Sequence, residues 1–449
     1  MRAALVLAAS SHNGAKDDHG PTTLRRHSFY GYCMTRWQWA VRLLTRHVWF
    51  RAALFCIFAA LLALVGAVVG PILPYDFGTK IGAKSVDNIL NVLAASMLTV
   101  TTFSLTAMVQ AYSGATNSIT PRAVQLLIDD TTAQNALSTF LGSFLFAVVG
   151  IIALSTDLYG ETGRIILYIG TILVVLYIVI TLLRWIEHVA RFGRVSDTID
   201  RVETAALKAV AELTQRVRFD VYTTAIPADA KPVRCDMIGR VTHIDLSDLT
   251  EVAEEITSDI YVAVSPGASI EPGRALAWLS GDVDNQQTAK ILNAFTIAHV
   301  RAFDQDPRFG LVVLSEIASR ALSPAVNDPG TAIAVLEAGT RVLAAFLDNE
   351  PTGKKKPPAS VTLPPIAFDD LIEDLYRPIA RDGAHMVEVG IRLQKSLYTL
   401  AGLEPGARVT CVAASTDALV RAEAALSSDA DRSALRQLHH ALWRGHATS

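Results

Sequence analysis

The chain has 449 residues, of which 51% are hydrophobic and 18% charged, and its formal net charge is −3. This balance gives no reason to expect a nucleic-acid partner, and the hydrophobic excess, concentrated in the first 185 residues, points to a membrane protein. The four cysteines, Cys33, Cys56, Cys235 and Cys411, stand far apart without a CxxC pair, which argues against structural zinc and against a disulfide framework.

Residues 1–33 lack the pattern of a secretory signal, because a short apolar run is followed by a polar, basic stretch and no cleavage site. An arginine-rich amphipathic segment begins at Met34 and leads into the first apolar stretch. We therefore interpret residues 1–33 either as a disordered tail or as an extension upstream of a true start at Met34.

Four apolar stretches follow, each long enough to cross a bilayer core of about 30 Å. They cover residues 52–70, 89–113, 137–156 and 165–183. Small residues such as Gly142 and Gly150 favour close helix contacts in the third, while the fourth is the most uniformly aliphatic and is expected to face lipid. The sequence predicts an α-helical four-span membrane domain over residues 34–184.

The second span carries polar side chains along one face. At 100° per residue they fall within an arc of about 120°. These residues are Asn88, Ser96, Thr99, Thr102, Thr106, Gln110 and Ser113. Lipid gives such a row no partners, so we expect it to meet other helices or water, although each hydroxyl can also bond to a carbonyl of its own helix. Ser96, Thr99, Thr102, Thr106 and Gln110 are therefore candidates for a transport pathway.

Arginines cluster before the first span and after the fourth, which predicts that both termini are cytoplasmic. The loop 114–136 lies on the same side. Thr120 as a cap and Pro121 in the first turn predict a short helix over residues 121–130.

A cytoplasmic α+β domain should follow the spans. An amphipathic coupling helix covers residues 185–226, a small β module covers 233–282, and helices cover 285–347, including 288–303 and 311–322. A linker rich in proline and lysine at 349–367 leads to a helical segment at 368–449, which is interrupted by a short strand or turn at 408–414.

The run SPAVNDPGTA at residues 323–332 combines two helix signals. Pro324 cannot continue a helix, and Asp328 followed by Pro329 has the pattern of an N-cap with proline in the first turn. The run therefore predicts a sharp helix break followed by a new helix.

Together with DPRFGL at 306–311, ITPR at 119–122 and four spans ahead of a soluble domain, this run resembles the bacterial predicted membrane proteins catalogued as domain of unknown function 2254 (DUF2254). The resemblance extends from about Met34 to the C-terminus and implies a fold arrangement and a bacterial inner-membrane location, but no reaction. This chain departs from the pattern at Thr120, where serine is expected, and in its N-terminal extension.

The sequence offers no motif for a catalytic site, a metal or a cofactor, and we expect no enzyme. His243, Asp245 and Asp248 lack tight ligand spacing and are interpreted as surface residues. A polar cluster is expected among Asp306, Arg308, Arg320, Asn327 and Asp328. Its members either cap and tie helices or bind a ligand, and the first interpretation is favoured.

Two functions fit these observations. In the first, the chain forms a homo-oligomeric channel or transport-related protein, the second span lines the pathway, and the cytoplasmic domain regulates it. In the alternative, the spans anchor a cytoplasmic sensor or scaffold that binds a ligand or partner. The ion or small ligand is unknown in both, and the lipid bilayer is the one partner that the sequence specifies.

Overall fold

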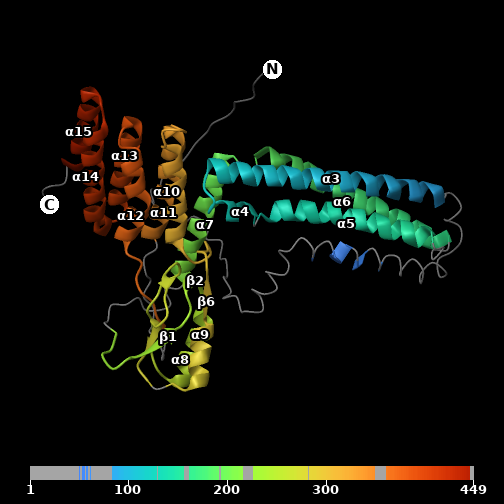
Figure 1. Ribbon diagram of the computed structural model, residues 1–449, viewed down its shortest axis with the longest axis horizontal. Helices are drawn as coiled ribbons and strands as arrows, with labels where there is room; N and C mark the ends of the chain where they lie inside the picture. Colours follow the sequence, from blue (N-terminus) through green and yellow to red (C-terminus); the bar gives the residue numbers. More distant parts are fainter. Residues whose placement is uncertain are drawn as a thin grey trace, which may run out of the picture. The chain divides into compact units, whose positions relative to one another are not determined.

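The computed structural model describes residues 50, 53–55, 57, 58, 61, 83–128, 130–155, 161–191, 194–215, 226–281, 283–348 and 361–444. The expectations for residues 1–33, for most of the first span and for linker residues 349–360 lie outside this part of the chain. Figure 1 shows the order of the described elements along the sequence.

By length and hydropathy, helices at Val86–Gly114, Val124–Ser155, Ile166–Arg191 and Pro329–Leu347 could each cross a membrane. The first three correspond to the predicted second, third and fourth spans. The last is α11 (Pro329–Leu347), whose Glu337 and Arg341 form ion pairs with Arg392 and Glu203. Because charged side chains are costly in hydrocarbon, and because α11 packs against four helices of the domain that follows the membrane helices, we assign it to that domain.

The membrane helices α3 (Ala83–Ser118), α5 (Thr131–Ser155) and α6 (Glu161–Arg191) pack on one another. Gly150 permits their close approach, since a Cβ there would meet Leu90 of α3 at 3.1 Å and Leu167 of α6 at 3.6 Å. Helix α6 leaves large apolar side chains exposed on the single chain, including Leu173, Leu176 and Leu183. That this span faces lipid stays a prediction.

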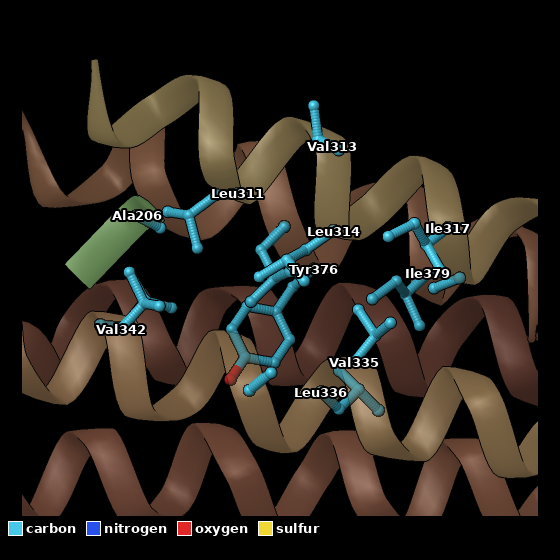
Figure 2. Packing of buried hydrophobic residues seen from close by; sticks show 14 of the residues in the cluster. Ala206, Leu311, Val313, Leu314, Ile317, Val335, Leu336, Val342, Tyr376 and Ile379 are labelled. Atoms are coloured by element: carbon cyan, nitrogen blue, oxygen red, sulfur yellow. The ribbon is translucent and has the colours of Figure 1, made fainter. Parts of the chain in front are cut away.

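The domain that follows the membrane helices is built around a helix layer that contains α7 (Val195–Gln215), α10 (Pro307–Ala321), α11, α12 (Phe368–Asp382) and α13 (Val387–Leu403). Figure 2 shows how these helices share one apolar core, with Ala206, Leu314, Leu336 and Tyr376 contributed by four of them. Glycines permit close contact here too, because a Cβ at Gly310 would overlap Ala206. The amphipathic face predicted for the coupling helix is therefore the face that α7 buries.

Two small sheets form the β module. One has the order β1-β5-β3-β7 and the other β4-β2-β6, and α8 (Leu246–Ile256) and α9 (Asn285–Asn293) share their core. The strands are β1 (Lys231–Cys235), β2 (Gly239–Ile244), β3 (Ile260–Val262), β4 (Ser269–Ile270), β5 (Arg274–Leu279), β6 (Phe295–Ala298) and β7 (Val361–Thr362). Strand β7 pairs in parallel with β3, so the chain returns to the module after the helices α10 and α11.

Several predicted boundaries are wrong. The helix expected over 288–303 ends with α9 at Asn293, and residues 295–298 pair with β2 as β6. Residues 408–414 are helical, as part of α14 (Arg408–Ala425), and α15 (Asp429–Trp443) follows. The fourth span does not run on as a single helix, because α6 ends at Arg191 and α7 begins at Val195.

The short helix after Pro121 exists, but it begins later than predicted, as α4 (Val124–Ile128). Residues 121–123 form a turn, in which the Ala123 N–H donates to the Thr120 carbonyl at 3.2 Å. Of the four cysteines, Cys235 and Cys411 lie in the described part of the chain, and both are free thiols in the core.

Candidate functional site

A cleft of about 460 Å³ lies between the β module and the helix layer, and four arginines line it. They are Arg240 of β2, Arg274 of β5, Arg301 of the loop after β6, and Arg308 of α10. The remaining lining residues are the segment 263–269, the residues 364–366, Asp306 and Asp370. We call this the arginine cleft. Guanidinium groups that converge in this way form a site suited to an anion.

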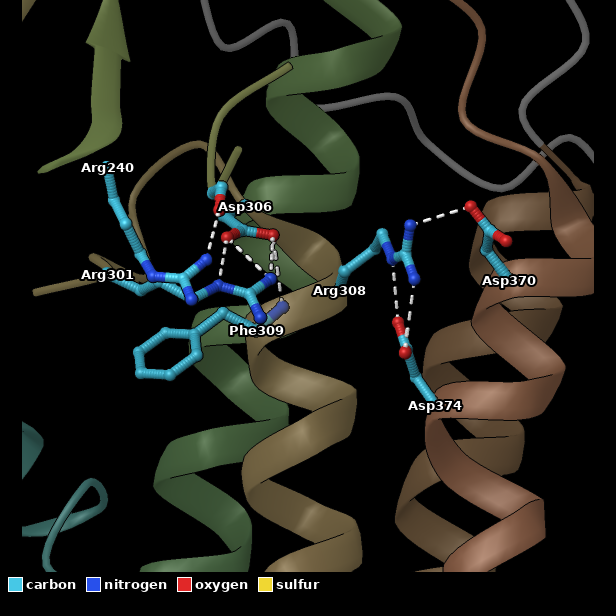
Figure 3. Close-up of polar contacts among 8 residues, drawn as sticks. Arg240, Arg301, Asp306, Arg308, Phe309, Asp370 and Asp374 are labelled. Carbon is cyan, nitrogen blue, oxygen red and sulfur yellow. Dashed lines mark hydrogen bonds and ion pairs between the residues drawn. The ribbon is translucent and has the colours of Figure 1, made fainter. Parts of the chain in front are cut away.

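Arg301 and Asp306 form the most buried pair in the cleft. Arg301 Nε donates to Asp306 Oδ2 at 2.8 Å and Nη2 donates to Oδ1 at 2.9 Å (Figure 3). The guanidinium also lies 5.0 Å from the centre of the Phe309 ring. Burial raises the pKa of Asp306, and the Arg301 charge and the Phe309 N–H offset part of this effect. Because Asp306 also caps α10, the pair fixes the loop to the start of that helix.

Arg308 joins α10 to α12. Its Nε and Nη2 donate to Asp374 at 2.7 and 3.2 Å, and its Nη1 donates to Asp370 at 2.6 Å (Figure 3). The hydrogen bond to Asp374 raises the pKa of Arg308, so this guanidinium stays charged. These bonds employ all three nitrogens of the side chain, so Arg308 forms a fixed wall of the cleft.

Arg240 and Arg274 differ from the other two, because each is held by a backbone carbonyl. Arg240 Nη1 donates to the Gly267 carbonyl at 2.9 Å, and Arg274 Nη1 donates to the Ser269 carbonyl at 2.6 Å. Within the described part of the chain, neither forms a salt bridge with a carboxylate. Their positive charges therefore remain uncompensated at the cleft.

Gly267 shapes the turn that holds Arg240. Its φ of +89° favours glycine, and a Cβ there would overlap Asp306 Oδ2. The turn Ser265-Pro266-Gly267 thus lies directly against the Arg301–Asp306 pair.

A family model described as "Predicted membrane protein (DUF2254)" matches residues 45–399. The chain belongs to this family. Curated relatives include an uncharacterized protein of Mycobacterium tuberculosis and one of Mycobacterium bovis, each 25% identical over 261 residues, or 55% of this chain and 50% of the relative. The chain thus spans about half the length of the curated relatives it matches. No solved structure matches it.

This DUF2254 chain does not bring the five residues of the predicted polar cluster together. Asp306 and Arg308 lie at the start of α10 and line the arginine cleft. Arg320, Asn327 and Asp328 lie at or beyond the other end of α10, about 20 Å away at 1.5 Å per residue.

Asp328 caps α11 as predicted, accepting from Thr331 N at 3.1 Å and from Thr331 Oγ1 at 2.6 Å. Asn327 has a φ of +52°, a left-handed conformation that asparagine tolerates better than most residues. The second group therefore forms the sharp turn between α10 and α11.

Sequence reasoning missed Arg240, Arg274 and Arg301, because they stand in three separate segments of the DUF2254 chain. The run DPRFGL is the one sequence pattern that marks the site, and the structure places its Asp306 against Gly267.

The residues of the predicted pathway lie on the face of α3 turned away from α5. Thr99, Thr102 and Thr106 are exposed on the single chain, and each donates to a carbonyl of its own helix at 2.9 to 3.1 Å. Ser96 bonds to the Leu93 carbonyl at 3.2 Å and is half-buried, and Gln110 is exposed.

His243, Asp245 and Asp248 lie at the junction of β2 and α8. Asp245 caps α8 by accepting from Ser247 N and Asp248 N at 3.0 and 3.2 Å. Its carboxylate is thus used in a helix cap, and the described residues contain no group of three or more His, Cys, Asp or Glu that could hold a metal ion.

Proposed function

We propose that this membrane protein is a receptor, in which the soluble domain binds a small anionic ligand in the arginine cleft and passes the event to the membrane helices. The observation that carries the proposal is the pair Arg240 and Arg274, whose charges have no carboxylate partner in the described part of the chain. A cleft of about 460 Å³ lies within the size range of small-molecule sites. The role proposed for the arginine cleft is ligand binding and not catalysis.

Helix α10 supplies a physical route for transmission. Arg308 lies in the cleft, and Glu316 lies eight residues further on, about 12 Å along the same helix. Glu316 Oε2 accepts from Thr120 Oγ1 at 2.9 Å, and Glu316 Oε1 pairs with Arg122. Thr120 and Arg122 follow the end of α3, so a displacement of α10 acts directly on the segment that leaves the membrane.

Helix α7 supplies a second route. Arg201 Nη1 lies 2.5 Å from Asp130 Oδ2, and Asp130 caps the membrane helix α5 by accepting from Thr132 N and Ala133 N. Glu203 lies two residues further along α7 and forms a bidentate pair with Arg341 of α11, in which both N–O distances are 2.6 Å. Both routes join membrane helices to the layer that carries Arg308.

Calorimetric titration of the full chain in nanodiscs of neutral lipid, with phosphate, sulfate and citrate at constant ionic strength, tests this proposal. The double variant Arg240→Ala and Arg274→Ala should weaken anion binding by about tenfold or more. Arg234→Ala is the matched control, because Arg234 lies at an exposed position of β1 and also bonds to a glycine carbonyl, that of Gly273, but does not line the cleft. Equal binding by the double variant, or no anion binding by the wild type, would overturn the proposal.

A homo-oligomeric channel or transport role is the second candidate. One observation favours it: the polar row of α3 lies on a face that the chain's own described helices leave open, and Gln110 lies on this exposed face. An amide in hydrocarbon gains from a partner, which a second copy or a water-filled path would provide. In that case the receptor domain would regulate flux through the assembly.

Both termini and the loop 114–136 are cytoplasmic in this proposal, in a bacterial inner membrane. The arginines that precede the first span and follow the fourth in the sequence support this orientation. The contacts of Thr120 and Arg122 with the soluble domain also support it. A phosphatase and a fluorescent reporter fused in turn after Ser449 test it. Phosphatase activity without fluorescence would reverse the orientation.

A further inference from the structure

The arginine cleft combines charged and apolar lining residues. We call Arg240, Arg274 and Arg301 the arginine wall; Arg308 also lines the cleft, and the two carboxylates there are Asp306 and Asp370. We call the lining segment Pro364, Pro365 and Ile366 the apolar wall. A ligand that fills the cleft therefore needs an anionic end and an apolar body.

We infer that the ligand is a phosphate ester, with its phosphate on the arginine wall and its apolar body against the segment 364–366; this inference rests on the proposed function. Arg301 is paired with Asp306, and Arg308 is paired with Asp370 and Asp374. The positive charges of Arg240 and Arg274 are therefore the two left to be neutralised by a ligand. A phosphate monoester carries close to two negative charges at neutral pH, and its oxygens match the guanidinium fork. A single carboxylate would leave one guanidinium without a counter-charge.

The hydrogen-bond donors of the arginine wall also fit a phosphate group. Each of Arg240 and Arg274 uses one terminal nitrogen on a backbone carbonyl, at 2.9 and 2.6 Å, which fixes the side chain and leaves its other N–H groups for a ligand. Arg301 is orientated by its two bonds to Asp306. Three arginines held in position before the ligand arrives reduce the ordering cost of binding.

The side chains of the apolar wall offer no hydrogen-bond donor to a second polar group of the ligand. Pro364 and Pro365 have no backbone N–H to donate, and Ile366 offers an aliphatic side chain. A hydrated, fully polar anion such as inorganic phosphate or citrate would cover this wall poorly, whereas an ester with an apolar or ring-shaped body would displace its water.

Titration of the full chain in neutral nanodiscs with three probes tests the inference. Phenyl phosphate has both features, inorganic phosphate lacks the apolar body, and phenylacetate has the ring with a carboxylate. Phenyl phosphate should bind about tenfold more tightly than either of the others. Ile366→Ala should reduce that preference over inorganic phosphate, while Arg274→Ala should weaken both phosphate compounds and the control Arg234→Ala neither.

Each contrary result has its own meaning. Equal affinity for phenyl phosphate and inorganic phosphate would overturn the apolar contact, and equal affinity for phenylacetate would overturn the preference for phosphate; in both cases the anion site itself would stand. Binding of no anion at all would overturn the proposed function.

A final titration in nanodiscs that contain phosphatidic acid separates two sources of the same chemistry. Weakened phenyl phosphate binding there would identify a lipid headgroup as the phosphate ester, and unchanged binding would identify a soluble one.

Discussion

Glu316 of α10 and Thr120, 196 positions apart in the chain, form a hydrogen bond of 2.9 Å in which the Thr120 hydroxyl is the donor. Thr120 is buried, and it belongs to the ITPR run that follows α3. The same carboxylate pairs with Arg122. A short sequence run next to the membrane is therefore held by the helix that begins in the arginine cleft.

Glu316→Ala should loosen the segment 119–128 without unfolding the domain. The variant removes the acceptor for a buried hydroxyl, at a cost of about 1 to 3 kcal/mol. Hydrogen exchange measured by mass spectrometry should show faster exchange in that segment. Glu373→Ala is the control, because Glu373 makes an exposed i,i+4 pair with Arg377 on α12. Equal exchange in both variants would mean that the Thr120 contact does not hold the segment.

Gly267→Ala should destabilise the folded chain by more than the backbone strain of an alanine at this position explains. Alanine at a φ of +89° is strained by about 1 to 2 kcal/mol, and its Cβ would also overlap Asp306 Oδ2. Gly273→Ala separates the two effects, since Gly273 has a φ of +84° with no atom within 4 Å of its Cβ position. Thermal melting should place Gly267→Ala clearly below Gly273→Ala. Equal melting temperatures would show that the turn can move away from Asp306.

Local chemistry predicted some of these features and not others. Asp328-Pro329 begins α11 as its cap pattern predicts, because capping depends on neighbours in the chain. Asp306-Pro307 has the same pattern and begins α10, four residues before the predicted start at residue 311. The segment 408–414 was misread because Val409, Thr410 and Val412 favour a strand, whereas burial of Cys411 in the helix layer determines the helix. The arginine cleft depends on contacts between β2, β5, the loop after β6 and α10, and no single segment contains that information.

Asp328→Ala should reduce stability by about 1 kcal/mol, whereas Asp328→Asn should be tolerated because asparagine caps equally well. The carboxylate accepts from Thr331 N and Oγ1, and those hydrogen bonds lower the pKa of Asp328. Its contribution is therefore present above the ordinary pKa and is lost as the pH falls through the lowered value. Denaturant melting of both variants provides the measurement. A stable Asp328→Asn chain that has lost its anion response would show that capping is not the whole role of this residue.

His439 should make the C-terminal helix sensitive to acid. Its Nδ1 lies 3.0 Å from Ser415 Oγ and 3.1 Å from Gln394 Oε1, and burial lowers the pKa of His439 below its ordinary value of 6.5. The folded chain therefore binds a proton less readily than the unfolded chain. Stability from this group is complete above pH 6.5 and is lost as the pH falls through the lowered pKa.

Melting measured between pH 7.5 and 5 should show a smaller decrease in His439→Gln than in the wild type. His299→Gln at an exposed position is the control, and it should keep the wild-type profile. Identical profiles for all three proteins would show that protonation of His439 does not weaken α15.

Thr102→Val tests the polar row of α3. The change removes a hydroxyl at nearly constant volume, and Thr102 Oγ1 now donates to the Leu98 and Thr99 carbonyls at 3.1 and 2.9 Å. If the row lines a water-filled path between copies, the variant should reduce ion flux in liposomes by favouring dewetting, with little change in melting. The neighbouring Thr101→Val is the control, because Thr101 bonds to the Met97 carbonyl at 2.7 Å but is half-buried and lies 100° further around the helix.

If the hydroxyls only bond within their helix or across a packed interface, Thr102→Val should instead shift detergent melting or oligomer state by about 0.6 kcal/mol and leave flux unchanged. Flux and melting measured on the same preparations separate the two cases. Unchanged flux with altered melting would rule against a pathway along α3, and the spans would then serve the arginine cleft as an anchor and as the element that receives its signal.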